Sequence, residues 1–282
     1  MRFIDKDNPE YRVKGLKINR QILDTQWVGS HYVNLEYSIV DKSELIDILV
    51  QEQEERCCYC MRRLHLQDHR KNVTLEHVIP NKITPEEWER DKVKYRKFTK
   101  LSDRNVTVCP GGKLINASTK FGMPPFPHFL SYDNLAASCD GRTLNQDGQE
   151  IAHHCCNNKR GNNYVEPLYF HSNVSEEISY DSRGHIVCDE EYEPYLNEDT
   201  GVNIMCKFLN DVRLFWKKVA DSEYTSQQIH EAVNNQDLRI DIIDDIFTND
   251  PTGHWLFLTQ QHAWSLFSDY DWFYSYYHNK IK

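Results

Sequence analysis

The chain has 282 residues, of which 39% are hydrophobic and 27% charged, and its 33 basic and 43 acidic side chains give a net charge of −10. This balance is typical of a soluble globular protein and excludes a disordered or collagen-like chain. No apolar run approaches the roughly 18 residues of a membrane-spanning helix. Charges among the first seven residues also disfavour a signal peptide. Nine cysteines in a chain without a leader point to reduced thiols or metal ligands, so we expect a cytoplasmic protein.

The charge is unevenly distributed along the chain. Residues 56–161 hold 18 basic and 11 acidic side chains, a net charge of +7, whereas residues 1–55 carry −4 and residues 162–282 carry −13. A polyanion is therefore expected to bind the middle of the chain, although acidic ends can also serve solubility alone. The sequence predicts an N-terminal helical lead over 1–55, a central module over 56–165 and an acidic, aromatic-rich, mainly helical region over 166–282.

The N-terminal lead ends in an expected helix. Asp41 and Glu44 have the spacing of a capping box, apolar residues follow on one face, and the polar run 51–55 is expected to be the solvated end of that helix. The central module holds seven of the nine cysteines and few long apolar runs. Hydrophobic burial alone would hold such a loop-rich segment poorly, so the sequence predicts a structural metal there.

The last third of the chain is expected to be helical. Apolar residues recur at three- and four-residue steps from about residue 203, and shorter helical stretches follow near 227–233 and 238–247. Residues 255–277 hold ten aromatic side chains in 23 positions. Such a stripe is suited to a core or to a protein–protein interface, for which Trp255, Phe257, Trp264, Phe267, Trp272 and Phe273 are the candidate anchors.

Four short motifs follow one another in the central module. The first and last contribute cysteines, the second pairs an acid with a histidine before a proline, and the third places an asparagine five residues before a cysteine. In order, they are Cys57-x-x-Cys60; Glu76-His77-x-x-Pro80; Asn134-Leu135-x-x-x-Cys139; and Cys156-Asn157-x-Lys159-Arg160-Gly161.

This order of motifs resembles the HNH endonucleases, the ββα-metal nucleases that carry a four-cysteine zinc site. Arg160 stands where that family usually has lysine. The resemblance covers residues 56–162 and implies an α+β chain, with a zinc-stabilised ββα-metal (treble-clef-like) HNH module embedded in a mainly helical protein. It also implies that Asn134 orients the ring of His77.

The chemistry of these residues is consistent with that family. Cys57, Cys60, Cys139 and Cys156 can supply the tetrahedral sulfur set of a closed structural zinc site. A histidine is neutral near pH 7 and can take a proton from water, so His77 is the expected general base.

The remaining roles concern the phosphodiester. Glu76 and Asn157 offer hard oxygen ligands for one catalytic Mg²⁺, which would bind the scissile phosphate. Lys159 and Arg160 are expected to contact the nucleic-acid backbone. These assignments complete the expected active site.

Three departures from the pattern leave alternatives open. The segment between His77 and Asn134 is long and includes the basic run 90–104 with interleaved aromatics, which is either a nucleic-acid contact or a solvated helix. Sixteen residues separate Cys139 from Cys156, so His153 is an alternative ligand to Cys139. The segment 105–109 imitates the third motif but has no Cys-Asn pair after it, so it ranks below Asn134.

The layout as a whole is similar to the PtuB nucleases of Septu and retron-associated anti-phage systems. That resemblance implies a toxic effector nuclease controlled by an ABC/SMC-like ATPase of the PtuA type and, in retrons, by a reverse transcriptase with its DNA–RNA product. The substrate would be phage DNA or a cellular RNA such as tRNA. The alternatives are a catalytically silent zinc module that binds nucleic acid or a protein, and a stand-alone restriction-type endonuclease.

Overall fold

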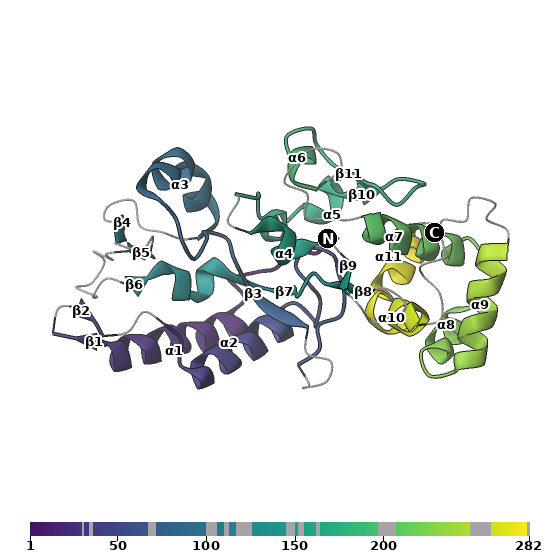
Figure 1. The fold of residues 1–282 in the computed structure, drawn as a ribbon, viewed down its shortest axis with the longest axis horizontal. Coiled ribbons are helices and arrows are strands. Elements are labelled where there is room, and N and C mark those ends of the chain that lie inside the picture. Colours follow the sequence, from purple (N-terminus) through teal and green to yellow (C-terminus); the bar gives the residue numbers. More distant parts are fainter. Residues whose placement is uncertain are drawn as a thin grey trace.

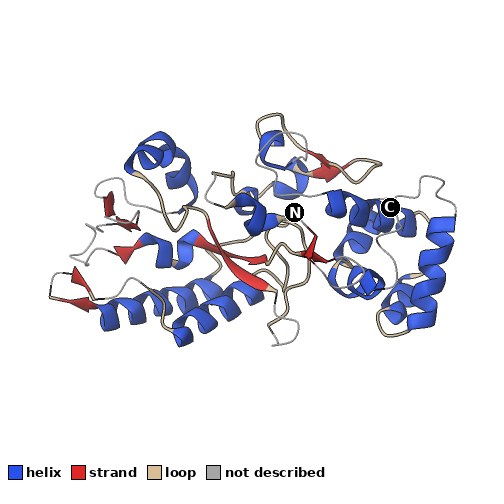
Figure 2. Cartoon of the chain, viewed as in Figure 1, coloured by secondary structure: helices blue, strands red, loops and turns tan. Residues whose placement is uncertain are grey.

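The fold is described from a computed structural model of the chain. It describes residues 1–29, 31–33, 36–66, 72–99, 106–109, 113–116, 126–144, 150–151, 155–161, 164–196, 207–248 and 261–280. Helices dominate, and the strands pair in small antiparallel sheets (Figure 2). The α+β class and the mainly helical character predicted from the sequence are thus confirmed.

Two helices form the N-terminal part. Helix α1 (Pro9–Gln26) begins after Asn8, whose side chain accepts a hydrogen bond from the backbone of Glu10. The short strands β1 (Trp27–Val28) and β2 (His31–Tyr32) pair before helix α2 (Ile39–Glu52). The N-cap of α2 is Ser38, which accepts from Asp41 N at 3.0 Å, so this helix begins before the capping box predicted at Asp41.

The centre of the molecule is a two-stranded sheet with a helix beside it. Strand β3 (Val73–His77) pairs antiparallel with β7 (Leu135–Cys139), with Val73 opposite Cys139 and His77 opposite Leu135. Helix α4 (Cys156–Arg160) packs against β7, and α2 also contacts the sheet (Figure 1). Strands β3 and β7 and helix α4 therefore lie together, although other elements separate them along the chain.

A long segment separates the two central strands. Its elements are α3 (Pro85–Thr99), β4 (Val106–Cys109), β5 (Lys113–Asn116), β6 (Phe126–Pro127) and the 3-10 helices η2 (His128–Leu130) and η3 (Tyr132–Asn134). Strands β4, β5 and β6 form one antiparallel sheet in that order. Between β7 and α4, β8 (Thr143–Leu144) pairs with β9 (Glu150–Ile151).

The C-terminal part is mainly helical. Its elements are η4 (Leu168–Phe170), α5 (Val174–Glu177), β10 (Ser179–Tyr180), β11 (Ile186–Val187), α6 (Glu193–Leu196), α7 (Lys207–Ala220), α8 (Ser226–Ala232), α9 (Gln236–Thr248), α10 (Gln261–Asp269) and α11 (Trp272–Lys280). Helices α7 to α11 gather at one end of the elongated molecule, with α11 against α7 (Figure 1). The helical stretches predicted from residue 203 onward are confirmed where they are described.

One hydrophobic core joins the three predicted segments. Its buried members include Leu45 of α2, Tyr132 of η3, Phe215 of α7 and Phe273 of α11. A smaller cluster packs under α3. The central sheet therefore rests on packing from both ends of the chain.

Among the described residues, no helix has the length and apolar character needed to cross a membrane.

Candidate metal centre and active site

The four cysteines predicted as zinc ligands come together. The sulfur atoms of Cys57, Cys60, Cys139 and Cys156 all lie within 4.8 Å of one another, and all four residues are buried. Tetrahedral Zn–S bonds of about 2.3 Å would place neighbouring sulfurs about 3.8 Å apart. The sulfurs of Cys60 and Cys139 are 3.7 Å apart, which fits a metal ion at the centre of the set.

The first cysteine pair lies in a tight hairpin. Arg56 and Arg63 form an isolated antiparallel bridge, and the backbone N–H of Cys57 donates to Arg62 O at 2.9 Å. Met61 adopts a left-handed conformation (φ 61°), and its N–H donates to Cys57 O. Cys57 also accepts, through its sulfur, the N–H of Cys139 at 3.2 Å, so the hairpin is attached directly to strand β7.

The second cysteine pair, Cys139 and Cys156, is close in space although sixteen residues separate the two in sequence. Cys139 ends β7 and Cys156 begins α4, and the backbone N–H of Cys155 donates to Gly141 O at 3.0 Å. Gly141 has φ +66°, and a Cβ atom there would lie 2.0 Å from Cys155 O, so only glycine permits this close approach. The β8–β9 pair carries the insertion away from the cysteines. His153, the alternative ligand, lies outside the described residues.

The thiols of the cluster differ in pKa. Hydrogen bonds from Cys155 and Cys156 lower the pKa of Cys139 to about 6, whereas burial raises the pKa values of Cys60 and Cys156. Zinc binds thiolates and releases their protons, so an ion held here would replace these sulfur hydrogen bonds. The donor set and its burial are those of a closed structural site.

Helix α4 supports the open edge of β3. The side-chain amide of Asn157 donates to Leu75 O at 3.0 Å and to the Thr74 hydroxyl at 3.2 Å. Arg160 donates to the carbonyls of His77 and of Val78, the latter at 2.8 Å. Since β7 is the only strand paired with β3 among the described residues, these two side chains hold the edge where a third strand would lie.

Arg160 does not have the role that the sequence predicted. Its side chain is 2% exposed and forms a buried ion pair with Glu76. A guanidinium used in this way cannot contact a nucleic-acid backbone, so the predicted phosphate contact of Arg160 is wrong. Lys159, one residue earlier on α4, is exposed and keeps its predicted position at the surface.

Glu76 is likewise more enclosed than a catalytic metal ligand was expected to be. The residue is completely buried, with Oε1 paired to Arg160. Its other carboxylate oxygen is buried without a hydrogen-bond partner among the described residues. That unpaired oxygen fits a cation ligand. The amide nitrogen of Asn157 is occupied by β3, which leaves its carbonyl oxygen as the ligand that this residue could offer.

Asn134 acts on the backbone that follows His77. Its Oδ1 accepts the N–H of Ile79 at 2.7 Å, its Nδ2 donates to Ile79 O at 3.1 Å, and its backbone carbonyl accepts from Val78 N. The residue is fully buried. The resemblance implied that Asn134 orients the ring of His77; the structure places its amide on the turn two residues after His77.

His77 faces a cleft on the opposite side of the sheet from α4. Successive strand residues point to opposite faces, so His77, Leu75 and Val73 share one face while Glu76 and Thr74 share the other. The cleft has a volume of about 530 Å³ and is also lined by residues at the start of α2 and in η2. The predicted catalytic residues are therefore divided between the two faces of β3.

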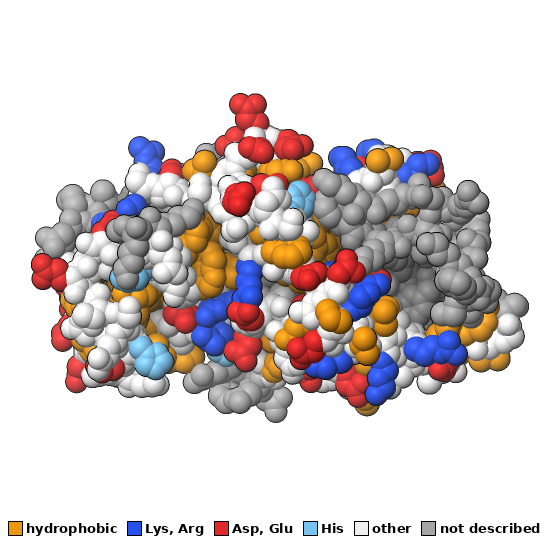
Figure 3. Space-filling model, turned by 180° about the vertical axis from the view of Figure 1, so that it is seen from behind, with side chains coloured by type: hydrophobic (Ala, Val, Ile, Leu, Met, Phe, Trp, Pro, Cys, Tyr) orange, Lys and Arg blue, Asp and Glu red, His pale blue; other side chains and the backbone are white. Residues whose placement is uncertain are grey.

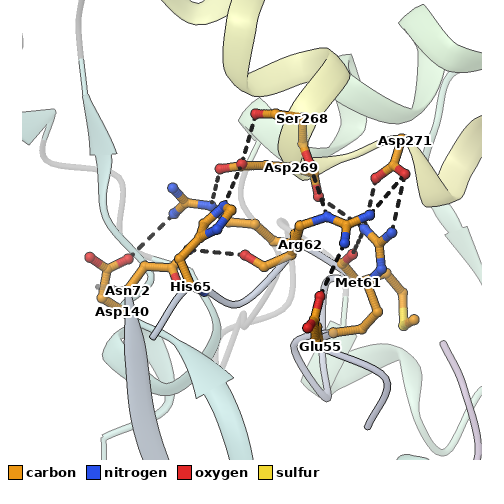
Figure 4. Close-up of polar contacts among 11 residues, drawn as sticks. Glu55, Met61, Arg62, His65, Asn72, Asp140, Ser268, Asp269 and Asp271 are labelled. Carbon is orange, nitrogen blue, oxygen red and sulfur yellow. Dashed lines mark hydrogen bonds and ion pairs between the residues drawn. The ribbon is translucent and has the colours of Figure 1, made fainter. Parts of the chain in front are cut away.

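A polar network that sequence reasoning missed joins the C-terminus to the first cysteine hairpin (Figure 4). Asp269, at the end of α10, accepts from Arg62 Nε at 3.1 Å and contacts His65 Nε2 at 2.9 Å. Asp271 accepts from Arg56 at 2.9 Å and from Arg63 at 3.3 Å. The sequence offered one sign of this network, because Asp269 and Asp271 are an acidic pair inside an otherwise aromatic stretch.

Gln53 is a second residue that the sequence did not reveal. It lies in the polar run predicted to be solvated, yet it is 3% exposed. Its side-chain amide donates to Ala137 O and accepts from Ala137 N, both at 2.7 Å, so it attaches the end of α2 to β7. Nothing in a run of five polar residues distinguishes this glutamine from its neighbours.

Two other candidate surfaces are more enclosed than the sequence suggested. Trp88 and Tyr95 of α3 are buried and stack with ring centroids 6.2 Å apart, so they form core rather than a nucleic-acid contact. Phe267 and Phe273 are fully buried and cannot anchor a partner, whereas Trp264 and Trp272 are half-buried. Trp255 and Phe257 lie outside the described residues, as does part of the basic run 90–104.

Comparison of the chain with protein-family models, with curated proteins and with solved structures found no match in any of the three.

Proposed function

We propose that this protein is a metal-dependent endonuclease of the HNH type, with His77 as its general base. The observation that carries the proposal is the position of His77 at the end of β3. Its side chain lines a solvent-connected cleft, while the same strand is attached to the four-cysteine cluster through β7 and α4. A base fixed on a rigid frame and open to substrate is the arrangement that general-base hydrolysis requires.

The chain's own residues have separable roles in such a reaction. His77 accepts a proton from the attacking water, and Asn134 positions the base by fixing the turn over Val78 and Ile79. Lys159 is exposed at the end of α4 and meets the phosphodiester backbone. The four-cysteine zinc ion is structural and takes no part in proton transfer.

The catalytic cation would be held by Glu76 and Asn157. The buried carboxylate oxygen of Glu76 that has no hydrogen-bond partner among the described residues supports this assignment. When bound by these residues, Mg²⁺ would supply charge stabilisation to a phosphate.

The biological role that we propose is that of a toxic effector in a Septu-like or retron-associated anti-phage system, acting in the cytoplasm. Its support is the motif order and the acidic C-terminal region, which are similar to the PtuB nucleases. A PtuA-type ATPase is the proposed partner, joined in a retron by the reverse transcriptase and its DNA–RNA product. The proposed contacts for such a partner are Trp264 and Trp272, which are half-buried.

A catalytically silent zinc module is the second candidate function. One observation favours it: Glu76 is fully buried in an ion pair with Arg160, on the face of β3 opposite to His77. A module of this kind would bind nucleic acid or a protein without cutting.

The test is a cleavage assay with purified full-length protein in the presence of Mg²⁺. Single-stranded DNA, duplex DNA and total RNA are offered separately, first with the protein alone and then with the co-expressed ATPase. Nuclease function predicts cleavage of at least one substrate that EDTA abolishes and that a His185→Ala control retains, since His185 lies on a distant exposed turn. Binding without cleavage under all of these conditions would favour the silent module.

A further inference from the structure

The cleft at His77 has the size and the lining of a ligand-binding site. Its volume of about 530 Å³ lies within the range of about 300–1,000 Å³ that is usual for small-molecule pockets. It lies between the start of α2, strand β3 and η2. The hydrophobic part of its wall includes Ile46, Leu75, Phe129 and Leu130, and polar side chains line the rest. A site for a bare phosphate would not need such a wall.

Polar side chains, Thr74 among them, make up about half of the residues that line the cleft, and they differ in charge. Lys42 is exposed on α2, His77 is half-buried at the end of β3, and Glu36 and Asn81 complete the rim. The hydroxyl oxygen of Tyr37 is buried, with no hydrogen-bond partner among the described residues. Since buried hydroxyls are nearly always hydrogen-bonded and Tyr37 lines the cleft, this hydroxyl is the candidate donor to a ligand there.

We propose that this cleft binds one unpaired nucleotide of a single-stranded substrate next to the bond that is cut. The base lies on the hydrophobic wall, the Tyr37 hydroxyl donates a hydrogen bond to the nucleotide, and Lys42 contacts its phosphate. The inference rests on the proposed nuclease function and adds to it the substrate class and two binding residues.

An unpaired strand suits the cleft better than a duplex does. Bases within a duplex are stacked and paired, and bringing one out costs a few kcal/mol. Single strands, by contrast, present their bases freely and bind through aromatic and apolar platforms beside a cationic group. The face drawn in Figure 3 shows acidic and basic side chains intermixed rather than the uniform basic field that non-specific duplex binding favours.

The state of Tyr37 agrees with a donor role. Burial raises the pKa of Tyr37 well above its usual value, so the phenol stays neutral and keeps its proton at physiological pH. A neutral hydroxyl can donate to a phosphate or a base without adding charge to an already acidic chain.

The experiment measures binding separately from cleavage. Fluorescein-labelled single-stranded DNA, single-stranded RNA and duplex DNA are titrated with full-length protein carrying His77→Ala, which prevents turnover. Adding Tyr37→Phe should weaken single-strand binding about tenfold, the effect of losing one hydrogen bond to a charged group. Lys42→Ala should weaken it and lower the slope of log affinity against log salt by about one.

Matched controls lie on α1, outside the cleft. Tyr11→Phe removes the hydroxyl of a half-buried tyrosine, and Lys17→Ala removes an exposed cation. Both should leave single-strand binding unchanged. The DNA and RNA arms identify the sugar that the cleft prefers, and preference for either single strand over the duplex supports the proposal.

Two outcomes separate this inference from the proposed function. Cleavage by the wild-type protein together with unchanged binding by Tyr37→Phe and Lys42→Ala would overturn the cleft assignment and leave the nuclease intact. Tyr37-dependent binding by a protein that cleaves nothing would support the cleft and overturn the nuclease. Duplex binding as tight as single-strand binding would also overturn the proposed substrate class.

Discussion

The two faces of strand β3 differ in how far their polar residues are enclosed, since Glu76 is fully buried and His77 lines a cleft. On the side of α4, Asn157 and Arg160 use their donors on β3 carbonyls, and only one oxygen of Glu76 is left over. On the cleft side, His77 is half-buried and the Tyr37 hydroxyl is buried without a partner among the described residues. An enclosed face gives stability, whereas a face that lines a cleft is open to a ligand. Substitutions on the two faces should therefore separate folding from function.

The largest effect is expected at the cysteine cluster. Cys60→Ser should prevent stable folding and zinc retention, because structural zinc contributes an apparent 10–16 kcal/mol or so in zinc-finger peptides, as much as the whole stability of a typical domain. Circular dichroism and metal analysis check this, with about one zinc per chain expected for the wild type. Cys188→Ser, outside the cluster, is the control. A folded, zinc-free Cys60→Ser protein would contradict the ligand assignment.

The next effect tests the buried ion pair. Arg160→Met should cost about 3–5 kcal/mol in urea unfolding because it leaves the carboxylate of Glu76 buried and unpaired. Adding Glu76→Gln should recover most of that loss, since the uncompensated charge is then gone. Lys159→Met, at an exposed site, should change stability by no more than about 0.5 kcal/mol. An Arg160→Met protein of normal stability but weakened nucleic-acid binding would restore the phosphate role that the structure removes.

A third comparison uses the two carboxylates that attach the C-terminal helices. Asp269→Ala should destabilise the protein by about 2–3 kcal/mol, because this buried side chain is bonded to the charged Arg62. Asp271→Ala should cost about 1 kcal/mol or less, since Asp271 is more exposed and its ion pairs are screened. Thermal unfolding of both variants measures the difference. Equal losses would mean that burial does not set the strength of this attachment.

The smallest effect on stability is expected in the cleft. Tyr37→Phe should change the free energy of unfolding by no more than about 0.5 kcal/mol, because the hydroxyl it removes has no hydrogen-bond partner in the described part of the chain. Gln53→Leu should cost about 1–3 kcal/mol, because the N–H of buried Ala137 loses its partner, while its carbonyl keeps the N–H of Cys58. Chemical denaturation of the two variants side by side measures this contrast. A large loss in Tyr37→Phe would show that the hydroxyl is structural.

The cysteine cluster was predictable because short motifs fix it. Cys57 and Cys60 are close in sequence, and the position of Asn134 before Cys139 indicates a strand that returns to the metal. The orientation of charged side chains was not predictable in the same way. Arg160 and Lys159 are adjacent and chemically alike, and only the register of α4 on β3 decides that one is buried and the other exposed.

Long-range contacts account for the other differences. The role of Asp269 depends on a helix pair more than 200 residues from the arginines it binds. The cleft depends on how α2 packs against β3, so Tyr37 and Lys42 had no motif to mark them. Aromatics such as Trp88 and Phe273 fit an interface or a core equally well by pattern, and packing alone places them in the core.

The variant His77→Ala tests most directly whether the four-cysteine cluster serves folding while the cleft serves catalysis. Zinc content, free energy of unfolding and cleavage rate are determined on the same preparation beside the wild type. We predict about one zinc per chain, stability within about 0.5 kcal/mol of the wild type and a cleavage rate lower by about 10²–10⁴. An undiminished cleavage rate, or loss of zinc and folding together with activity, would contradict the separation of the metal frame from the catalytic cleft.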